Sequence, residues 1–216
     1  GRAFNENIQL ELNDANKPLP GLIVHKAKII QGTLHTGDNL TLEVNRHTRG
    51  DIALNHSATH LLHAALKEVL GEHIKQAGSL VASNRLRFDY THFSPLTDKE
   101  RIRIESRVNE KVRENIQVST QEMDIDSAIK EGAMALFGEK YGETVRVVNI
   151  PGFSKELCGG THITATGDIG LFRITSEGGI ASGVRRIEAV TGATAYDTIR
   201  AEQESLSAIR GLLKAP

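Results

Sequence analysis

Two pairs of metal-binding residue types, far apart in the sequence, place the strongest constraint on how this chain can fold. His56 and His60 lie four residues apart, as do Cys158 and His162. Residues spaced i, i+4 on a helix face the same way, so the two histidines can bind one ion. Thiolate and imidazole are ligands that zinc prefers, and four of them complete a tetrahedron. The spacing predicts a fold that brings both pairs to one zinc ion.

The sequence around the second pair supports this prediction. Cys158 is the only cysteine of the chain, and Gly159 and Gly160 follow it. Glycine lets the backbone turn tightly, so the thiol and the His162 imidazole can point toward one spot. The alternative interpretation is a buried free cysteine beside a polar loop histidine. His63 lies on the same helix face as the first pair, where a surface histidine is favoured over a residue that supports the ligands.

Four protein ligands leave the role of the metal open. They would fill a tetrahedral zinc ion and exclude water, which is normal for a structural site. Catalysis would need one ligand to leave or a fifth position to open. His56 or His60 can act as a base only when the metal does not hold it. Cys158 has no base nearby in the sequence, so a role as covalent nucleophile ranks below metal binding.

The composition excludes several classes of protein. With one cysteine, the 216-residue chain has no internal disulfide, and we expect a cytoplasmic protein without a membrane partner. No hydrophobic run is long enough to cross a membrane. The net charge of −1 argues against a general nucleic-acid binder, so contacts with RNA would need local basic patches. The absence of an initial methionine suggests a processed product or a piece of a longer protein.

The hydrophobic pattern predicts an α+β protein with a mostly antiparallel sheet and a C-terminal helix. Short alternating runs with regular turns in residues 1–48 predict a small β-barrel. Asn55 is expected to cap a helix that stops at Gly71 and carries His56 and His60 opposite its apolar stripe. Strands are expected within 79–90, near Val118 and at 144–150, 169–176 and 184–190, and helices from the capping box at Thr97, around 126–136 and over 193–213.

Several longer motifs resemble the editing domain of bacterial-type alanyl-tRNA synthetases. They occur in order at residues 55–66, 76–81, 132–141, 156–162, 166–170 and 183–189. The editing domain of threonyl-tRNA synthetase shares the two metal-binding pairs, but the Cys-Gly-Gly-Thr-His loop favours the alanyl family. The resemblance implies a β-barrel subdomain at 1–48, an α+β editing core at 49–195, and at 196–216 the start of a helix toward a C-terminal domain.

The resemblance implies hydrolysis of the ester in alanine-specific tRNA that carries serine or glycine. A synthetic site sized for alanine cannot exclude the smaller glycine, and it rejects an added hydroxyl by only about a hundredfold. The family pattern makes His56, His60, Cys158 and His162 the ligands of one zinc ion. It also places the first three of these residues at the catalytic centre.

Substrate contacts also follow from the resemblance. Gln76 and Thr161 are expected at the bound amino acid, and the amide of Gln76 can bond a seryl hydroxyl that alanine lacks. Lys140, Arg185 and Arg186 are expected to contact the tRNA backbone, with a solvated charged surface as the alternative for each. The aminoacylation and C-terminal domains of such a synthetase have no counterpart here, so the chain is not expected to activate alanine.

Three functions therefore remain open from the sequence. The first is an aminoacyl-tRNA hydrolase. The second is a zinc-stabilised tRNA-binding module without activity of its own. The third is a free-standing metallohydrolase that acts in trans or on another ester or amide. The first and third predict hydrolysis, and the second predicts none.

Overall fold

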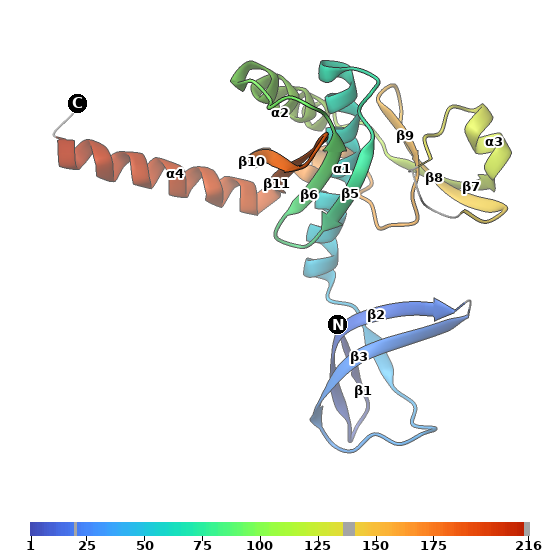
Figure 1. Cartoon of the computed structure of the whole chain (residues 1–216). Helices are drawn as coiled ribbons and strands as arrows, with labels where there is room; N and C mark the ends of the chain where they lie inside the picture. Colours follow the sequence, from blue (N-terminus) through green and yellow to red (C-terminus); the bar gives the residue numbers. More distant parts are fainter. Residues whose placement is uncertain (20, 136–140, 214–216) are drawn as a thin grey trace. The chain divides into compact units, whose positions relative to one another are not determined.

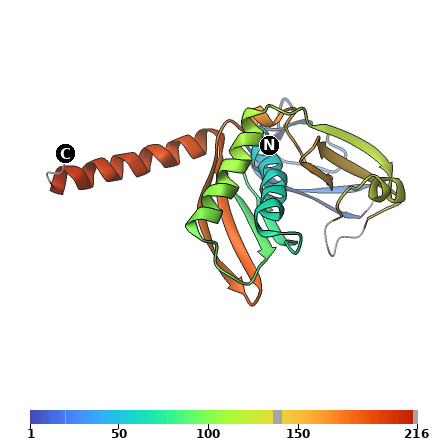
Figure 2. The same cartoon turned by 90° about the horizontal axis from the view of Figure 1, so that it is seen from above.

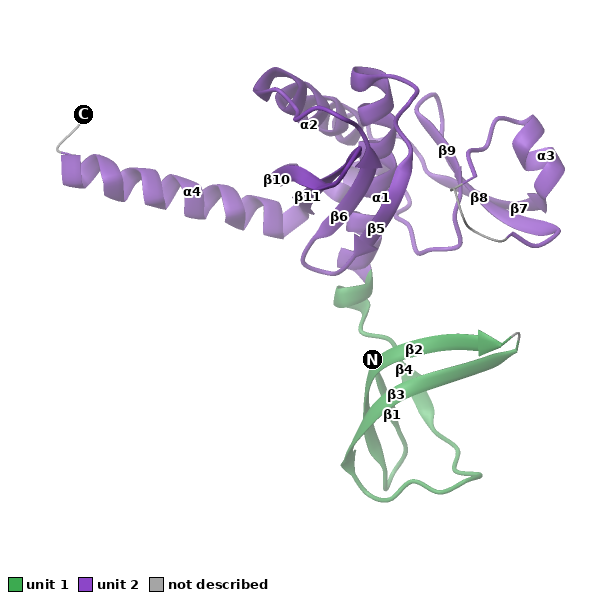
Figure 3. Ribbon diagram, in the orientation of Figure 1, with its two compact units in different colours: residues 1–49 green, residues 50–216 purple. Residues whose placement is uncertain are grey.

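The computed structural model describes residues 1–19, 21–135 and 141–213, in two compact units, 1–49 and 50–216 (Figure 3). The predicted α+β class, with antiparallel sheets and a C-terminal helix, is confirmed. Within the described residues, no helix is both long and apolar enough to span a membrane.

The first unit is a four-stranded antiparallel sheet. Its strands are β1 (Arg2–Phe4), β2 (Gln9–Leu19), β3 (Leu22–Gln31) and β4 (Thr41–Glu43), in the order β3-β2-β1-β4. No pairing of β3 with β4 closes it among the described residues, so the sheet is open and the expected barrel is not seen. A three-residue edge strand offers few hydrogen bonds for closure, and only Ala3, Ile8 and Leu10 form the buried cluster.

The second unit is built around a four-stranded antiparallel sheet of order β10-β11-β6-β5 (Figure 1). The order places strands from the middle of the chain beside strands from its end. Its strands and the two helices that share its core are β5 (Gln76–Val81), β6 (Leu86–Thr91), β10 (Phe172–Ala181), β11 (Val184–Thr191), α1 (Arg46–Leu70) and α2 (Asp98–Arg113).

Helices α1 and α2 pack against this sheet (Figure 2). Leu62 of α1, Ile104 of α2 and Phe88 of β6 are fully buried in one cluster, which fixes the helix that carries His56 and His60. The predicted capping box is confirmed at Thr97, whose hydroxyl accepts the amide of Glu100 at 3.2 Å.

A smaller three-stranded sheet carries the second half of the site. Its order is β7-β8-β9, all antiparallel, and the chain enters the Cys158 loop directly after β9. The remaining elements of the unit are β7 (Ser119–Asp124), α3 (Ile125–Lys130), β8 (Thr144–Ile150), β9 (Ser154–Leu157), a 3₁₀ turn (Thr166–Ile169) and α4 (Gly192–Leu213).

Two helix boundaries differ from the prediction. Asn55 does not cap α1, which begins nine residues earlier at Arg46, although Gly71 ends the helix as expected with φ +117°. Asn55 is buried, and its side chain bonds the carbonyl of Ala82 and the hydroxyl of Thr191, both at 2.8 Å. Asparagine often caps the start of a helix, but here the hydrogen-bonding groups of the Asn55 side chain bond residues that are distant in the sequence.

Helix α3 is shorter than the predicted helix around 126–136. It ends at Lys130, and Gly132 follows with φ +82°, a conformation that a helix interior does not contain. Residues 136–140 of the corresponding family motif, including Lys140, lie outside the described residues.

Candidate metal centre

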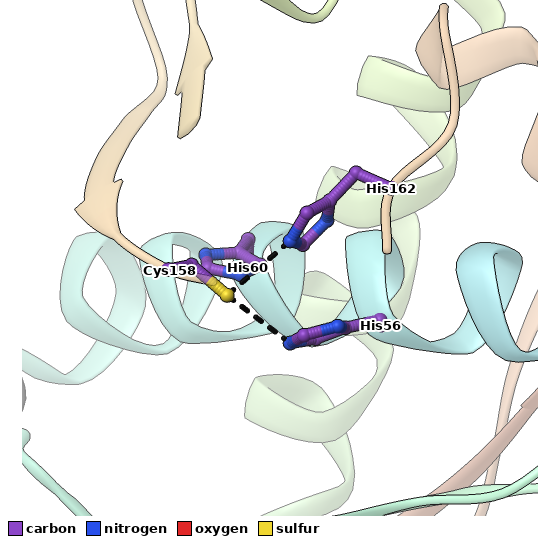
Figure 4. Close-up of side chains that lie close together, drawn as sticks. All are labelled: His56, His60, Cys158 and His162. Carbon is purple, nitrogen blue, oxygen red and sulfur yellow. Dashed lines mark hydrogen bonds between the residues drawn. The ribbon is translucent and has the colours of Figure 1, made fainter. Parts of the chain in front are cut away.

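The two predicted pairs come together. One potential ligand atom from each of His56, His60, Cys158 and His162 lies within 4.8 Å of all the others. Figure 4 shows the two histidines on α1 and the other two residues on the facing loop. The Cys158 sulfur is 3.4 Å from Nε2 of His56 and 3.3 Å from Nε2 of His162. Tetrahedral zinc with ordinary bond lengths separates sulfur from nitrogen by about 3.6 Å, so the spacing suits such an ion.

The outer ring nitrogens of two of the histidines have partners that fit metal binding. Nδ1 of His162 is 3.1 Å from the hydroxyl of Ser57. Nδ1 of His60 is 2.9 Å from a carboxylate oxygen of Glu156, an ion-pair contact that lies outside hydrogen-bond alignment. Histidine ligands commonly bond a carboxylate, carbonyl or hydroxyl through the ring nitrogen that the metal does not use. Both contacts leave Nε2 for an ion.

Glu156 is a part of the site that sequence reasoning did not assign. It is 2% exposed, and its second oxygen is 3.2 Å from Nδ1 of His63. Burial favours the neutral acid, but the adjacent His60 outweighs it and holds the pKa of Glu156 well below its usual range. Burial likewise lowers the pKa of His60, yet the carboxylate prevails and raises it to about 10. The interpretation of His63 as a surface residue was wrong, because it is 2% exposed.

Cys158 is held in the form that binds metals. Burial of the thiol acts to raise its pKa, but hydrogen bonds with His162 and His56 lower the pKa to about 3. The side chain is therefore a thiolate at neutral pH. Three imidazoles surround this thiolate within the cluster, an arrangement suited to a ligand.

The glycine turn is required by close approach to α1. A Cβ atom on Gly160 would overlap Cε1 of His56, whereas one on Gly159 would meet nothing within 4 Å. Arg146 of β8 fixes the turn, since its Nη1 donates to the carbonyl oxygens of Cys158, at 3.2 Å, and of Gly160. The sequence carried no signal for Arg146, which lies on β8, twelve residues before Cys158.

A cavity of about 240 Å³ opens beside the cluster. Its lining includes Gln76 and Ser79 of β5 together with His56, His60 and Cys158. The Gln76 amide donates to the Ser79 hydroxyl at 3.4 Å, so the cavity lining includes polar groups besides those of the cluster.

The other predicted contact residues lie elsewhere. Thr161 is half-buried and is not among the described residues that line this cavity. Arg185 forms two bonds to Glu177, at 2.5 and 2.8 Å, and Arg186 forms two to Asp89, at 2.7 and 2.8 Å. Both guanidinium groups are therefore paired within the sheet.

The sequence of this chain is similar to those of known proteins. Residues 145–188 match the family described as the threonyl and alanyl tRNA synthetase second additional domain. An alanine–tRNA ligase of Staphylococcus aureus (strain Newman) is 50% identical over 214 residues, 99% of this chain. An alanine–tRNA ligase of Xanthomonas campestris pv. campestris (strain B100) is 54% identical over 206 residues, 95% of this chain. The chain is related to a segment of alanyl-tRNA synthetase.

The predicted resemblance is thereby confirmed for nearly all of the chain. The chain spans only about a quarter of these relatives, 24% and 23% of their lengths. The match to the domain family shared by threonyl and alanyl tRNA synthetases runs from β8 into β11 and includes Cys158 and His162. The longer similarity to alanine–tRNA ligases covers His56 and His60 as well.

Proposed function

We propose that this chain is an editing module that hydrolyses mischarged alanine-specific tRNA and releases serine or glycine. The observation that carries the proposal is the cavity lined both by Gln76 and by three residues of the cluster, His56, His60 and Cys158. A group of metal ligands then shares a space suited to an amino acid with a side chain able to recognise a hydroxyl. The similarity to alanine–tRNA ligases supports tRNA as the carrier of that amino acid.

One zinc ion is the proposed cofactor, held by His56, His60, Cys158 and His162. When bound, zinc would supply Lewis acidity or orientation at the ester carbonyl. The protein's own contribution is a set of fixed ligands. Glu156 and Ser57 fix two imidazole rings through Nδ1, and the Gly160 turn brings the thiolate of Cys158 to them.

The reaction adds water across the ester between the amino acid and the tRNA ribose. A hydroxyl group joins the acyl carbon, and the ribose oxygen leaves with the second proton of the water. His56, His60 and Cys158 line the cavity in which this exchange would occur. The proposed catalytic role belongs to these three residues together.

Selection of the substrate rests on Gln76. The Gln76 amide would bond a seryl hydroxyl, and the same bond is impossible for alanine. Glycine would be admitted by its small size. Thr161 is proposed at the same amino acid because it precedes His162 in the family motif.

The tRNA backbone would be met by Lys140, Arg185 and Arg186. To bind a phosphate, each arginine would have to release or share the carboxylate that it binds in the folded chain. This competition weakens each contact with the tRNA backbone. The proposed division places a β-sheet subdomain at 1–48, the editing core at 49–195 and the start of a linker helix at 196–216. A cytoplasmic location fits a role in translation.

Deacylation by the zinc-loaded chain tests this proposal. We expect release of serine from alanine-specific tRNA, and loss of that release with Cys158→Ala or after chelation. Zinc measurement on the same samples separates loss of metal from loss of chemistry. Survival of the seryl ester at high concentrations of the zinc-loaded chain would instead favour a tRNA-binding module.

A further inference from the structure

One residue, Arg146, holds the backbone of the loop that carries Cys158. The Cys158 amide donates to the Arg146 carbonyl at 2.9 Å, which extends the pairing of β8 with β9 by one bond. Nη1 of Arg146 in turn donates to the carbonyl oxygens of Cys158 and Gly160. Among the described residues, no other hydrogen bond reaches the backbone of residues 158–161. This stretch therefore depends on Arg146 for every backbone hydrogen bond that it forms.

The guanidinium group of Arg146 is available for this task because no carboxylate binds it. Arg146 is half-buried and forms no ion pair among the described residues. Glu122 lies opposite it in the register of β7 and β8, yet the two side chains do not form an ion pair. Hydrogen bonds from a charged donor are roughly twice as strong as those between neutral groups. The two loop carbonyls thus receive the attraction that a carboxylate would otherwise take.

The loop has little stiffness of its own. Gly159 and Gly160 follow Cys158, and glycine loses more conformational freedom on folding than any other residue. A stiffer residue does not fit at 160, because a Cβ atom there would overlap the His56 ring. Close approach to α1 therefore requires flexible residues next to the thiolate that has to be positioned. The order that the glycines lack must come from a partner outside the loop.

We propose that Arg146 is a positioning residue for the metal centre, and that it holds the Cys158 loop in its metal-binding conformation before the ion binds. The inference rests on the proposed function, in which the cluster binds zinc. The far end of the loop is already held from α1, since the Ser57 hydroxyl accepts the Ile163 amide at 3.2 Å and lies 3.1 Å from Nδ1 of His162. Arg146 holds the Cys158 end. Preformed ligands bind an ion more tightly because binding does not have to order them.

Cobalt(II) binding to the metal-free full chain tests this role without any hydrolysis. Cobalt accepts the same nitrogen and sulfur ligands as zinc, and its ultraviolet charge-transfer band reports the bond to a thiolate. Arg146→Met keeps an unbranched side chain without donors, whereas Arg146→Lys keeps a charged donor. We expect Arg146→Met to bind cobalt about ten- to a hundredfold more weakly, as is usual when a residue that supports a ligand is lost. Arg146→Lys should recover most of that affinity.

Asn149→Ala is the matched control. Asn149 is also half-buried on β8, and its side chain forms no hydrogen bond among the described residues. We expect this variant to bind cobalt as the wild type does, with the same thiolate band. If Arg146→Met does not fold, as judged by circular dichroism, Arg146→Gln takes its place, because it removes the charge and shortens the reach to the carbonyls.

The outcomes separate this inference from the proposed function. Equal cobalt affinities in the wild type and in the uncharged variant, or an equal loss in the uncharged variant and Arg146→Lys, would overturn the role of Arg146. The expected order of affinities would support that role even if seryl-tRNA is not hydrolysed, in which case only the hydrolytic function is lost. Absence of cobalt binding by the wild type would overturn the zinc site and this inference together.

Discussion

The carboxylate of Glu156 lies 2.9 Å from Nδ1 of His60, and both side chains are almost fully buried. The contact fixes the ring so that Nε2 is directed to the cluster. It also places a negative charge behind a ligand, which strengthens that ligand's affinity for a cation. We therefore propose Glu156 as a positioning residue for the candidate metal centre.

Replacement of Glu156 with glutamine should weaken zinc binding by about ten- to a hundredfold. The amide retains the shape of the side chain but removes the charge beside His60. Competition with a chromogenic chelator measures the affinity. Glu131→Gln, which alters an exposed carboxylate paired with Lys155, serves as the control. Equal zinc affinities in the two variants would contradict the role of Glu156.

Gly160→Ala should disrupt the metal centre, whereas Gly159→Ala should leave it intact. A Cβ at 160 overlaps the His56 ring, and a Cβ at 159 has open space. We expect zinc affinity to fall by at least about tenfold only for the first variant, since one ligand is displaced. Metal content after dialysis against a weak chelator checks this. A similar loss in both variants would point to the flexibility of the loop instead of the contact with His56.

Acidification should protonate Cys158 only at unusually low pH in the chelated protein. The pKa of about 3 lies below the ordinary thiol value, so thiolate pairing contributes stability above the unfolded pKa and is lost as pH falls toward about 3. His60, with a pKa of about 10, has the opposite sign: its contribution is complete below the ordinary histidine value and is lost as pH rises through about 10.

The ultraviolet absorbance of the thiolate reports this titration. It should persist in the chelated protein down to about pH 5, where an ordinary cysteine is fully protonated. Cys158→Ser supplies the blank, because Cys158 is the only cysteine. An absorbance that appears only above about pH 8 would show an ordinary thiol.

Asn55→Ala should destabilise the second unit by about 1–3 kcal/mol, because it leaves buried partners unsatisfied. Its side chain joins α1 to the carbonyls of Ala82 and Ser83 and to the hydroxyl of Thr191. Thr191→Val removes only one of these bonds and should cost less. Chemical denaturation followed by circular dichroism compares the two. Unchanged stability of Asn55→Ala would mean that Asn55 contributes no net stabilisation.

The metal centre could be predicted from the sequence because its ligands occur as two short, regular motifs. The i, i+4 spacing of His56 and His60 needs only a helix, and the Cys158 loop needs only a turn. Glu156 and Arg146 gave no comparable signal. Glu156 contacts a histidine 93 residues away in sequence, and that pairing exists only after β9 packs against α1.

The fold was predicted best where local chemistry decides the structure. The capping box at Thr97 and the strand expected at 144–150 depend on residues close together in the sequence, and both were confirmed. The prediction that Asn55 starts a helix was wrong, because Ala82 and Thr191, both distant in the sequence, bond its side chain. Closure of the first sheet likewise depends on whether distant edge strands meet, which alternation along each strand does not specify.

The most direct test of the central claim is single-turnover hydrolysis of alanine-specific tRNA charged with serine or with alanine, by the zinc-loaded chain. We predict that the seryl ester is cleaved at least about tenfold faster than the alanyl ester, because Gln76 can bond only the first. Gln76→His should reduce this ratio without loss of zinc. No cleavage of the seryl ester, or equal cleavage of both esters, would contradict the assignment of this site to editing.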